Sequence, residues 1–402
     1  MNDTPRGSRL NIAIFGRRNV GKSSLINAIT GQGTALVSDT PGTTTDPVYK
    51  AMELLPLGPV ELIDTAGIDD EGQLGALRVK RSMTVLNQSD MVLLVADASE
   101  GLGIYEHRVL DMIRERGISV LLVFNKSDLV DGSMKLESDV PYVFVSAKNK
   151  EGIDALKRAI VENAPADWCD RAILDGVVSA GDTVVLVVPI DMEAPRGRLI
   201  LPQVQTIRDI LDHGACAVMT KEDELPGVLK NLKSKPALII TDSQVFGRVS
   251  EDIPPNIPLT SFSILFARYK GDLDSLVDGT RAIDRLKPGD RVLIMEACTH
   301  HPIGNDIGRV KIPKLLDRHV GGELYYDYLA GRDMPPDCDM KKYSLIIHCG
   351  ACMINRREML FRLSRASEAG VPVVNYGVII AYLNGILDRV IKPFYANGAY
   401  DL

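Results

Sequence analysis

One short segment constrains this chain more than any other. An apolar run, Leu10–Phe15, is followed directly by GRRNVGKS at residues 16–23 and then by a helix-like stretch, Lys22–Thr30. The segment fits the pattern G-x-x-x-x-G-K-S/T between a strand and a helix, where backbone N–H groups and the helix N-terminus surround phosphate groups. We expect Lys22 to reach the β- and γ-phosphates and the Ser23 hydroxyl to bind Mg²⁺. The segment therefore predicts an α/β nucleotide-binding domain.

Three further motifs follow at the ends of strand-like runs, and they select the base. DTAG at residues 64–67 offers Asp64 for the Mg²⁺ shell and the Gly67 N–H for the γ-phosphate. NKSD at 125–128 offers Asp128 as an acceptor for the guanine N1–H and exocyclic amine, two donors that adenine lacks. SAK at 146–148 matches a loop that backs the base. The set predicts a GTP site.

A hydroxyl-rich loop, GTTTD at residues 42–46, lies between the first two motifs and resembles a switch loop, with Thr44 as the second expected Mg²⁺ ligand. Of the whole set, Lys22, Asn19, Asp64 and Gly67 are the expected catalytic residues. The residues expected to bind the nucleotide or its metal are Gly16, Arg17, Arg18, Asn19, Val20, Gly21, Lys22, Ser23, Ser24, Thr44, Asp64, Thr65, Ala66, Gly67, Asn125, Lys126, Asp128, Ser146, Ala147 and Lys148.

The ordered set GRRNVGKS, GTTTD, DTAG, NKSD and SAK resembles the TrmE-Era-EngA group of GTPases over residues from about Leu10 to Ile160. Ile68 stands where Ras-like proteins have the glutamine that orients the attacking water, so another group must promote hydrolysis. In several members of the group, the residue at the position of Asn19 helps to hold K⁺ beside the phosphates. The resemblance thus implies potassium-stimulated GTP hydrolysis; the alternative is that Asn19 only shapes the loop.

Alternating strand-like and helix-like runs predict an α/β fold in three domains. The first, residues 1–166, is a doubly wound GTP-binding domain. The second, 170–258, carries no motif, and we expect it to mediate a homodimer through sheet or helix pairing. A proline-rich stretch, Ile253–Pro258, marks the boundary to a third domain at 259–402.

The third domain carries clustered cysteines and histidines. Cys298 and His300 follow the strand-like run 292–295, and the sequence His348-Cys349-Gly350-Ala351-Cys352 follows a second run, 345–347. Parallel sheets usually place ligand sites at such strand ends. These residues are consistent with ordinary packing, with a Zn²⁺ site or with an iron–sulfur cluster. Clustered soft ligands favour the cluster.

The pattern C-x-H followed by H-C-x-x-C, with EACTHHPIGNDIGRVKIPKLL around the first motif, resembles the HydF family of [FeFe]-hydrogenase maturation GTPases. This resemblance spans nearly the full chain. It implies a [4Fe-4S] cluster on Cys298, Cys349 and Cys352, with a fourth, exchangeable or non-cysteine ligand. His300 and His348 are candidates for that position or for supporting roles, and Asp191 is a weaker candidate.

The same resemblance implies a scaffold that transiently carries a dinuclear iron precursor with CO and cyanide ligands. Arg309 and Lys311 could help to hold this anionic complex, although surface cations are usually only solvated. No C-x-x-x-C-x-x-C motif occurs in the sequence, so two radical S-adenosylmethionine maturases are the implied suppliers and the apo-hydrogenase the recipient. We expect structural or surface roles for His301, His319, Cys169, Cys216 and Cys338.

Two other functions fit parts of the pattern: a ribosome- or tRNA-associated GTPase with an accessory zinc domain, and a nucleotide switch with a vestigial third domain. The net charge of −7 shows no basic footprint for nucleic acid. No apolar run approaches the ~18 residues of a membrane span, and the N-terminal residues lack a signal segment. We therefore expect a cytoplasmic protein without nucleic-acid or membrane partners, whose six cysteines stay reduced.

Overall fold

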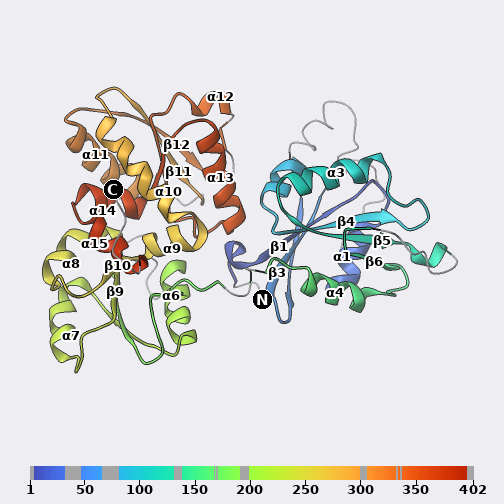
Figure 1. Ribbon diagram of the computed structural model, residues 1–402, viewed down its shortest axis with the longest axis horizontal. Coiled ribbons are helices and arrows are strands. Elements are labelled where there is room, and N and C mark those ends of the chain that lie inside the picture. The colour runs from blue at the N-terminus through green and yellow to red at the C-terminus, as the bar shows by residue number, and fades with distance from the viewer. Residues whose placement is uncertain are drawn as a thin grey trace. The chain divides into compact units, whose positions relative to one another are not determined.

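The chain divides into two compact units, Met1–Asp170 and Arg171–Leu402. A computed structural model describes residues 4–31, 47–65, 81–130, 138–166, 168, 171–190, 199–298, 306–331, 334–335 and 337–395. Each unit is built from mainly parallel strands and the helices between them (Figure 1). The predicted α/β class is confirmed.

The first unit holds, within its described residues, a six-stranded sheet in the order β2-β3-β1-β4-β5-β6, in which β2 runs antiparallel to β3 and the other pairs are parallel. Every residue of β1 is buried, as its uninterrupted apolar sequence predicts for a central parallel strand. The strands are β1 (Leu10–Phe15), β2 (Val48–Leu54), β3 (Gly58–Asp64), β4 (Met91–Asp97), β5 (Ser119–Asn125) and β6 (Tyr142–Phe144).

Helices cover both faces of this sheet. Figure 1 shows α3 on one face of the sheet and α1 and α4 on the other. Alternate β1 residues point to these opposite faces: Ile12 belongs to the buried cluster that includes α1 and α4, and Ala13 to the cluster that includes α3. The helices are α1 (Lys22–Thr30), α3 (Ile104–Glu115) and α4 (Ile153–Glu162), with short 3₁₀ helices η1 (Arg6–Ser8) and η2 (Ser127–Leu129). The doubly wound sheet predicted for the GTP-binding domain is confirmed.

The second unit contains two four-stranded parallel sheets, counted over the part of the chain that the structure describes. The first has the order β10-β9-β7-β8. Its strands are β7 (Thr183–Val187), β8 (Cys216–Thr220), β9 (Leu238–Thr241) and β10 (Leu259–Ser261), and its helices are α6 (Leu201–Asp212), η3 (Glu222–Glu224), α7 (Leu225–Asn231), η4 (Ser243–Val245), α8 (Phe246–Asp252) and α9 (Phe262–Lys270).

The other sheet has the order β12-β11-β13-β14. Its strands are β11 (Arg291–Glu296), β12 (Tyr325–Ala330), β13 (Leu345–His348) and β14 (Val373–Asn375). The helical segments around it are α10 (Leu273–Asp278), η5 (Gly279–Arg285), the π-helical turn η6 (Ile307–Lys311), α11 (Ile312–Val320), α12 (Asp337–Met340), α13 (Arg356–Glu368), α14 (Tyr376–Leu383), α15 (Leu387–Ile391) and η7 (Lys392–Phe394).

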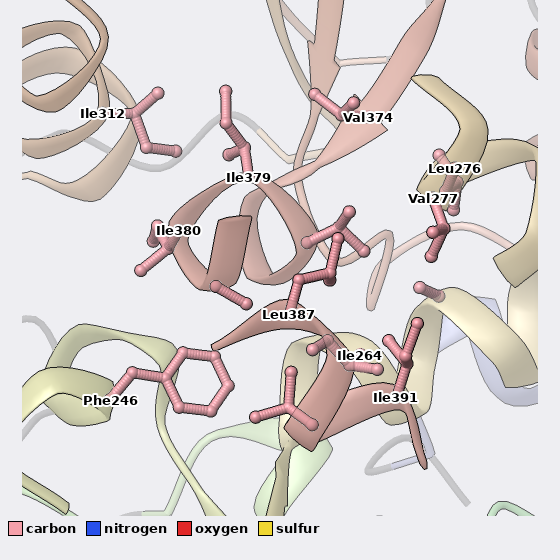
Figure 2. Packing of buried hydrophobic residues seen from close by; sticks show 14 of the residues in the cluster. Phe246, Ile264, Leu276, Val277, Ile312, Val374, Ile379, Ile380, Leu387 and Ile391 are labelled. Carbon is pink, nitrogen blue, oxygen red and sulfur yellow. The ribbon is translucent and has the colours of Figure 1, made fainter. Parts of the chain in front are cut away.

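One hydrophobic core serves both sheets of the second unit. Figure 2 shows Phe246 of α8 and Ile264 of α9 beside Ile380, Leu387 and Ile391 of α14 and α15. Because these side chains belong to one cluster of buried residues, the two sheets form a single compact unit. The sequence-based boundary at 258/259 inside this unit stays a prediction. No helix among the described residues is long and apolar enough to cross a bilayer.

Candidate functional site

Two glycines shape the loop between β1 and α1. Gly16 has φ +155°, and a Cβ there would lie 2.3 Å from the Val95 carbonyl oxygen. Gly21 has φ +91°, and its Cβ would lie 2.3 Å from Nδ2 of Asn125. Side chains at these positions would clash with the backbone of β4 and with the NKSD motif. The close approach brings the loop and the α1 N-terminus together into a cradle for phosphates.

The phosphate end of the site joins Lys22, Ser23 and Asp64. The Lys22 ammonium donates to the carbonyl oxygens of Gly16 and Arg17 at 2.7 and 2.8 Å. The Ser23 hydroxyl donates to Oδ2 of Asp64 at 2.7 Å. Burial raises the pKa of Asp64, while the Ser23 hydrogen bond and the charges of Lys22 and Lys50 lower it in part. These oxygens suit a hard cation such as Mg²⁺.

The base end joins the other two motifs to the loop. The Asn125 amide donates to Val20 O at 2.8 Å and accepts from the Ala147 N–H at 3.0 Å, so one side chain ties three motifs together. The Ser146 hydroxyl donates to Oδ1 of Asp128 at 2.6 Å, which fixes the carboxylate that is expected to read guanine. A cavity of about 540 Å³ lies here, lined by Asn19, Gly21, Ser24, Asn27, Ala28, Gly31, Asn125, Lys126, Asp128, Leu129, Ala147, Lys148 and Lys150.

Other predicted nucleotide residues have local roles. The Arg17 guanidinium pairs with the buried Glu106 at 2.8 Å and with Glu100 at 3.0 Å. The Thr65 hydroxyl donates to Ile14 O at 2.7 Å, and Arg18 is exposed. The residues of the predicted site that lie outside the described residues are Thr44, Ala66, Gly67, Asp191 and His300.

The two cysteine motifs end neighbouring strands. Strands β11 and β13 pair in parallel with Met295 opposite His348, so Cys298 and the loop Cys349–Cys352 leave the same edge of the sheet. The Ala297 N–H donates to Cys349 Sγ at 3.2 Å. Burial raises the pKa of Cys349 to about 12, with contributions from Cys352 and Cys298. Burial also raises the pKa of Cys352, again with a contribution from Cys298. The three thiols therefore lie within electrostatic range of one another.

His348 is buried beneath this loop, and both ring nitrogens have partners. Nδ1 lies 2.8 Å from Cys349 O, and Nε2 lies 3.1 Å from the Arg362 guanidinium. Burial and the Arg362 charge lower the pKa of His348 to about 3, although the hydrogen bond to Cys349 O raises it in part. The ring is thus neutral, donates through Nδ1 and accepts at Nε2. This hydrogen bonding favours a supporting role over a cluster ligand.

Several predicted accessory residues are engaged elsewhere. Arg309 pairs with the buried Glu296 at 3.4 Å, and Lys311 donates to Gln244. His319 pairs with Asp284 at 3.0 Å, as expected for a surface histidine. Cys216 is exposed on β8. His301, Cys169 and the side chain of Cys338 lie outside the described residues.

Among the described residues, no group of three or more His, Cys, Asp or Glu side chains lies close enough together to hold a metal ion. Three residues near the cysteine loop were not predicted: Lys270, which donates to Cys352 O at 3.1 Å, Arg362 and Tyr376. Lys270 looks like an ordinary cation at a helix end, and Arg362 like one more charge in RREMLFRLSR. Tyr376 is half-buried, and its hydroxyl donates to Glu296 Oε1 at 3.4 Å; burial, Cys349 and Glu296 raise its pKa. Arg362 pairs locally with Glu358 of the same helix, but its contacts with His348 and Gly331, like those of Lys270, join segments that no local pattern connects.

Three family models match the chain in succession. Residues 11–126 match the 50S ribosome-binding GTPase model. Residues 173–271 match the hydrogen maturase F dimerization domain, and residues 274–393 match the hydrogen maturase F tetramerization domain. The first unit is therefore a GTPase domain, and the second unit carries domains for oligomerization.

Curated relatives share the GTPase part. The tRNA modification GTPase MnmE of Natranaerobius thermophilus is 39% identical over 155 residues, which cover 37% of this chain and 33% of that protein. MnmE of Trichormus variabilis is 40% identical over 183 residues, covering 44% and 39%. GTPase Der of Kosmotoga olearia is 37% identical over 164 residues, covering 37% of each. The chain thus spans little more than a third of the length of these relatives.

Solved structures match over a similar share of the chain. The G domain of the T. maritima FeoB iron transporter is 27% identical, covers 39% of this chain and 98% of that one, and has a TM-score of 0.31. A bacterial selenocysteine-specific elongation factor EF-Sec is 21% identical, covers 46% and 33%, and has a TM-score of 0.33.

Proposed function

The chain belongs to the hydrogen maturase F family, and we propose that it is a GTP-hydrolysing scaffold that binds a [4Fe-4S] cluster and carries a dinuclear iron precursor to apo-hydrogenase. The observation that carries this proposal is the pairing of β11 with β13. It brings two cysteine motifs that are distant in sequence to one sheet edge, in a unit that matches family-specific models over 173–271 and 274–393.

The donor set at this edge fits an iron–sulfur cluster. Thiolates are the usual cluster ligands, and hydrogen bonds to sulfur tune the cluster's potential. Cys349 already accepts one such bond from Ala297 N–H. The apolar surroundings of Ala351, Ile354 and Met359 limit water access to the site. In a four-iron cluster each cysteine binds a different iron, so the thiols need not surround one ion.

Three cysteines leave one cluster position for another ligand. His348 is committed to Cys349 O and Arg362, so His300 and Asp191 remain the proposed candidates for that position. When bound, the cluster would supply an iron atom with an exchangeable site, at which the precursor docks as cargo. The chain's own residues hold the thiols in place and keep the surroundings apolar.

The GTPase unit is proposed to use Asn19 and K⁺ in place of an arginine finger. Asn19 has φ +63° and lines the cavity over the α1 N-terminus. Turnover should be faster in KCl than in NaCl at equal ionic strength, and N19A should lose the difference while keeping GTP affinity. Equal wild-type rates in the two salts would remove this part of the proposal.

The first sheet of the second unit has a free edge that suits a homodimer. β8 pairs only with β7 among the described strands, and its Met219 is 43% exposed. A sheet edge can pair with the same edge of a second copy. We propose this contact for the dimerization domain; M219R should shift the mass measured by light scattering towards the monomer, whereas K230M, on a helix of the same half, should not.

Anaerobic reconstitution tests the central proposal. Wild-type protein should take up iron and sulfide in about a four-to-four ratio and show the absorption and EPR signals of a [4Fe-4S] cluster. C349A and C298A should lose the cluster, and C216A, which removes an exposed cysteine, should keep it. Colourless protein holding one zinc would overturn the proposal. Activation of apo-hydrogenase should then require both Lys22 and Cys349, with K22A and C349A inactive.

The partners follow from the same proposal: two radical S-adenosylmethionine maturases supply the precursor and apo-hydrogenase receives it. The alternative is a ribosome- or tRNA-associated GTPase with a zinc domain, and its support comes from the similarity to tRNA modification GTPases. Those relatives cover less than half of this chain. The family models for residues 173–393 favour maturation.

A further inference from the structure

A reciprocal pair of cations joins the C-terminal end of α9 to the Cys349–Cys352 loop. The Lys270 ammonium, at the last position of α9, donates to Cys352 O at 3.1 Å and to Ile354 O at 2.7 Å. In return, the Arg356 guanidinium at the start of α13 donates to Tyr269 O at 3.1 Å and Gly271 O at 2.6 Å. Each segment thus supplies the cation that satisfies the other's carbonyl groups.

The environment of Lys270 makes this arrangement unusual. The residue is only 2% exposed, and lysine is almost never fully buried unless its charge has partners. Its ammonium group is held by two backbone carbonyl groups of the segment Cys352–Ile354. Cys352 itself packs against the apolar cluster that contains Phe262 and Phe266 of α9. Lys270 is therefore placed to hold the C-terminal end of the loop against α9.

The Arg356 arm completes the last turn of α9. The final carbonyl groups of a helix have no intrahelical donors, and a cation near them is favourable. Since Arg356 follows the cysteine loop directly, its contacts fix the far end of that loop. Both arms therefore hold the C-terminal end of the loop against α9.

We propose that Lys270 and Arg356 form a clamp that positions the Cys349–Cys352 loop for the cluster and couples it to α9. This inference rests on the proposed function. The clamp crosses the border between the two family models, because α9 falls in the dimerization match and the loop in the tetramerization match. A movement of α9 would therefore be transmitted directly to Cys352, one of the three proposed cluster ligands. Both cations are positioning residues rather than ligands.

Hydrogen–deuterium exchange on the metal-free protein tests the clamp without the cluster. In K270M and R356Q, amides of residues 349–356 should exchange at least about tenfold faster than in wild type, equivalent to about 1.4 kcal/mol of local stability. K230M removes an exposed lysine of α7 and should leave these rates unchanged. If K270M does not fold, R356Q carries the test alone, because its side chain is only partly buried. If folded K270M and R356Q exchange the amides of residues 349–356 no faster than K230M does, the clamp is overturned.

Cluster retention tests the positioning role. Reconstituted K270M and R356Q should lose iron to a chelator at least about tenfold faster than wild type, while K230M retains it. Faster exchange with unchanged iron loss overturns the positioning role. Wild-type protein that takes up no cluster overturns the proposed function instead, and the exchange experiment still decides whether the clamp exists.

Discussion

The buried pair Arg362–Glu358 supports the cysteine loop, and replacing its cation makes a strong prediction. Arg362 is 3% exposed and donates to Glu358 Oε1 at 2.6 Å, to Gly331 O at 2.9 Å and towards His348 Nε2 at 3.1 Å. R362M leaves a buried carboxylate and two acceptors without this donor. Breaking a buried ion pair from one side costs about 3–5 kcal/mol, so the second unit should lose about that much stability.

Urea unfolding of the metal-free protein measures the effect unit by unit. Trp168, the single tryptophan, lies in the first unit, where its indole N–H donates to Leu57 O at 3.2 Å. Its fluorescence transition should not move in R362M, whereas the circular dichroism transition of the second unit should shift to lower urea. R365M, on the same helix, is the matched control and should change stability by less than about 0.5 kcal/mol.

A second variant separates the lost charge from the lost side chain. In E358L/R362L no unpaired charge remains, and apolar replacement of a buried pair is often neutral or better, so at least about 1 kcal/mol should return relative to R362M. A loss below about 1 kcal/mol in R362M would refute the reasoning. So would a double variant that is less stable than R362M.

Three further predictions concern both sites. S146A removes the hydroxyl that donates to Asp128 and should weaken GDP binding by about 1 kcal/mol, roughly fivefold, in a fluorescent-nucleotide titration. Unchanged GDP affinity would contradict this role of the hydroxyl. G21A should weaken GDP binding far more than that, because its Cβ would lie 2.3 Å from Asn125 Nδ2; calorimetry showing wild-type affinity would contradict the geometry. Folding lowers the pKa of His348 from 6.5 to about 3, so its contribution to stability is present above pH 6.5 and is lost as the pH falls towards 3. H348Q should therefore lose less stability than wild type between pH 6.5 and pH 3 in urea unfolding. An equal loss in both proteins would show that another group causes it.

The sequence predicts the elements that carry strong local signals. The strand Leu10–Phe15 and the helix Lys22–Thr30 are confirmed to the residue, because a phosphate loop allows only one arrangement of its flanks. The strands β2, β10 and β12 were not predicted. β2 and β12 lie at sheet edges and carry half-exposed residues, so neither shows the uninterrupted apolar run of a central strand. β10 is buried but only three residues long, too short to give a strand pattern.

The candidate sites divide in the same way. The phosphate and base motifs, with Lys22 and Asp128, can be recognised from the sequence because each motif is contiguous in the chain. The cysteine motifs can be recognised too. The pairing of β11 with β13 that brings them together cannot, because it depends on how the strands are ordered in the sheet. Lys270 reaches a carbonyl group 82 residues away in sequence, and no periodicity or spacing encodes such a contact.

The common core of the second unit has a consequence for how this protein can be dissected. Phe246 and Ile264 come from the segment that matches one family model, and Ile380 and Leu387 come from the segment that matches the next, yet all four bury each other's surface (Figure 2). A cut between residues 271 and 274 would expose the apolar surfaces on both fragments to water. We therefore expect the two segments to unfold together, and a fragment that keeps the cysteine loop in place to need the whole of residues 171–402.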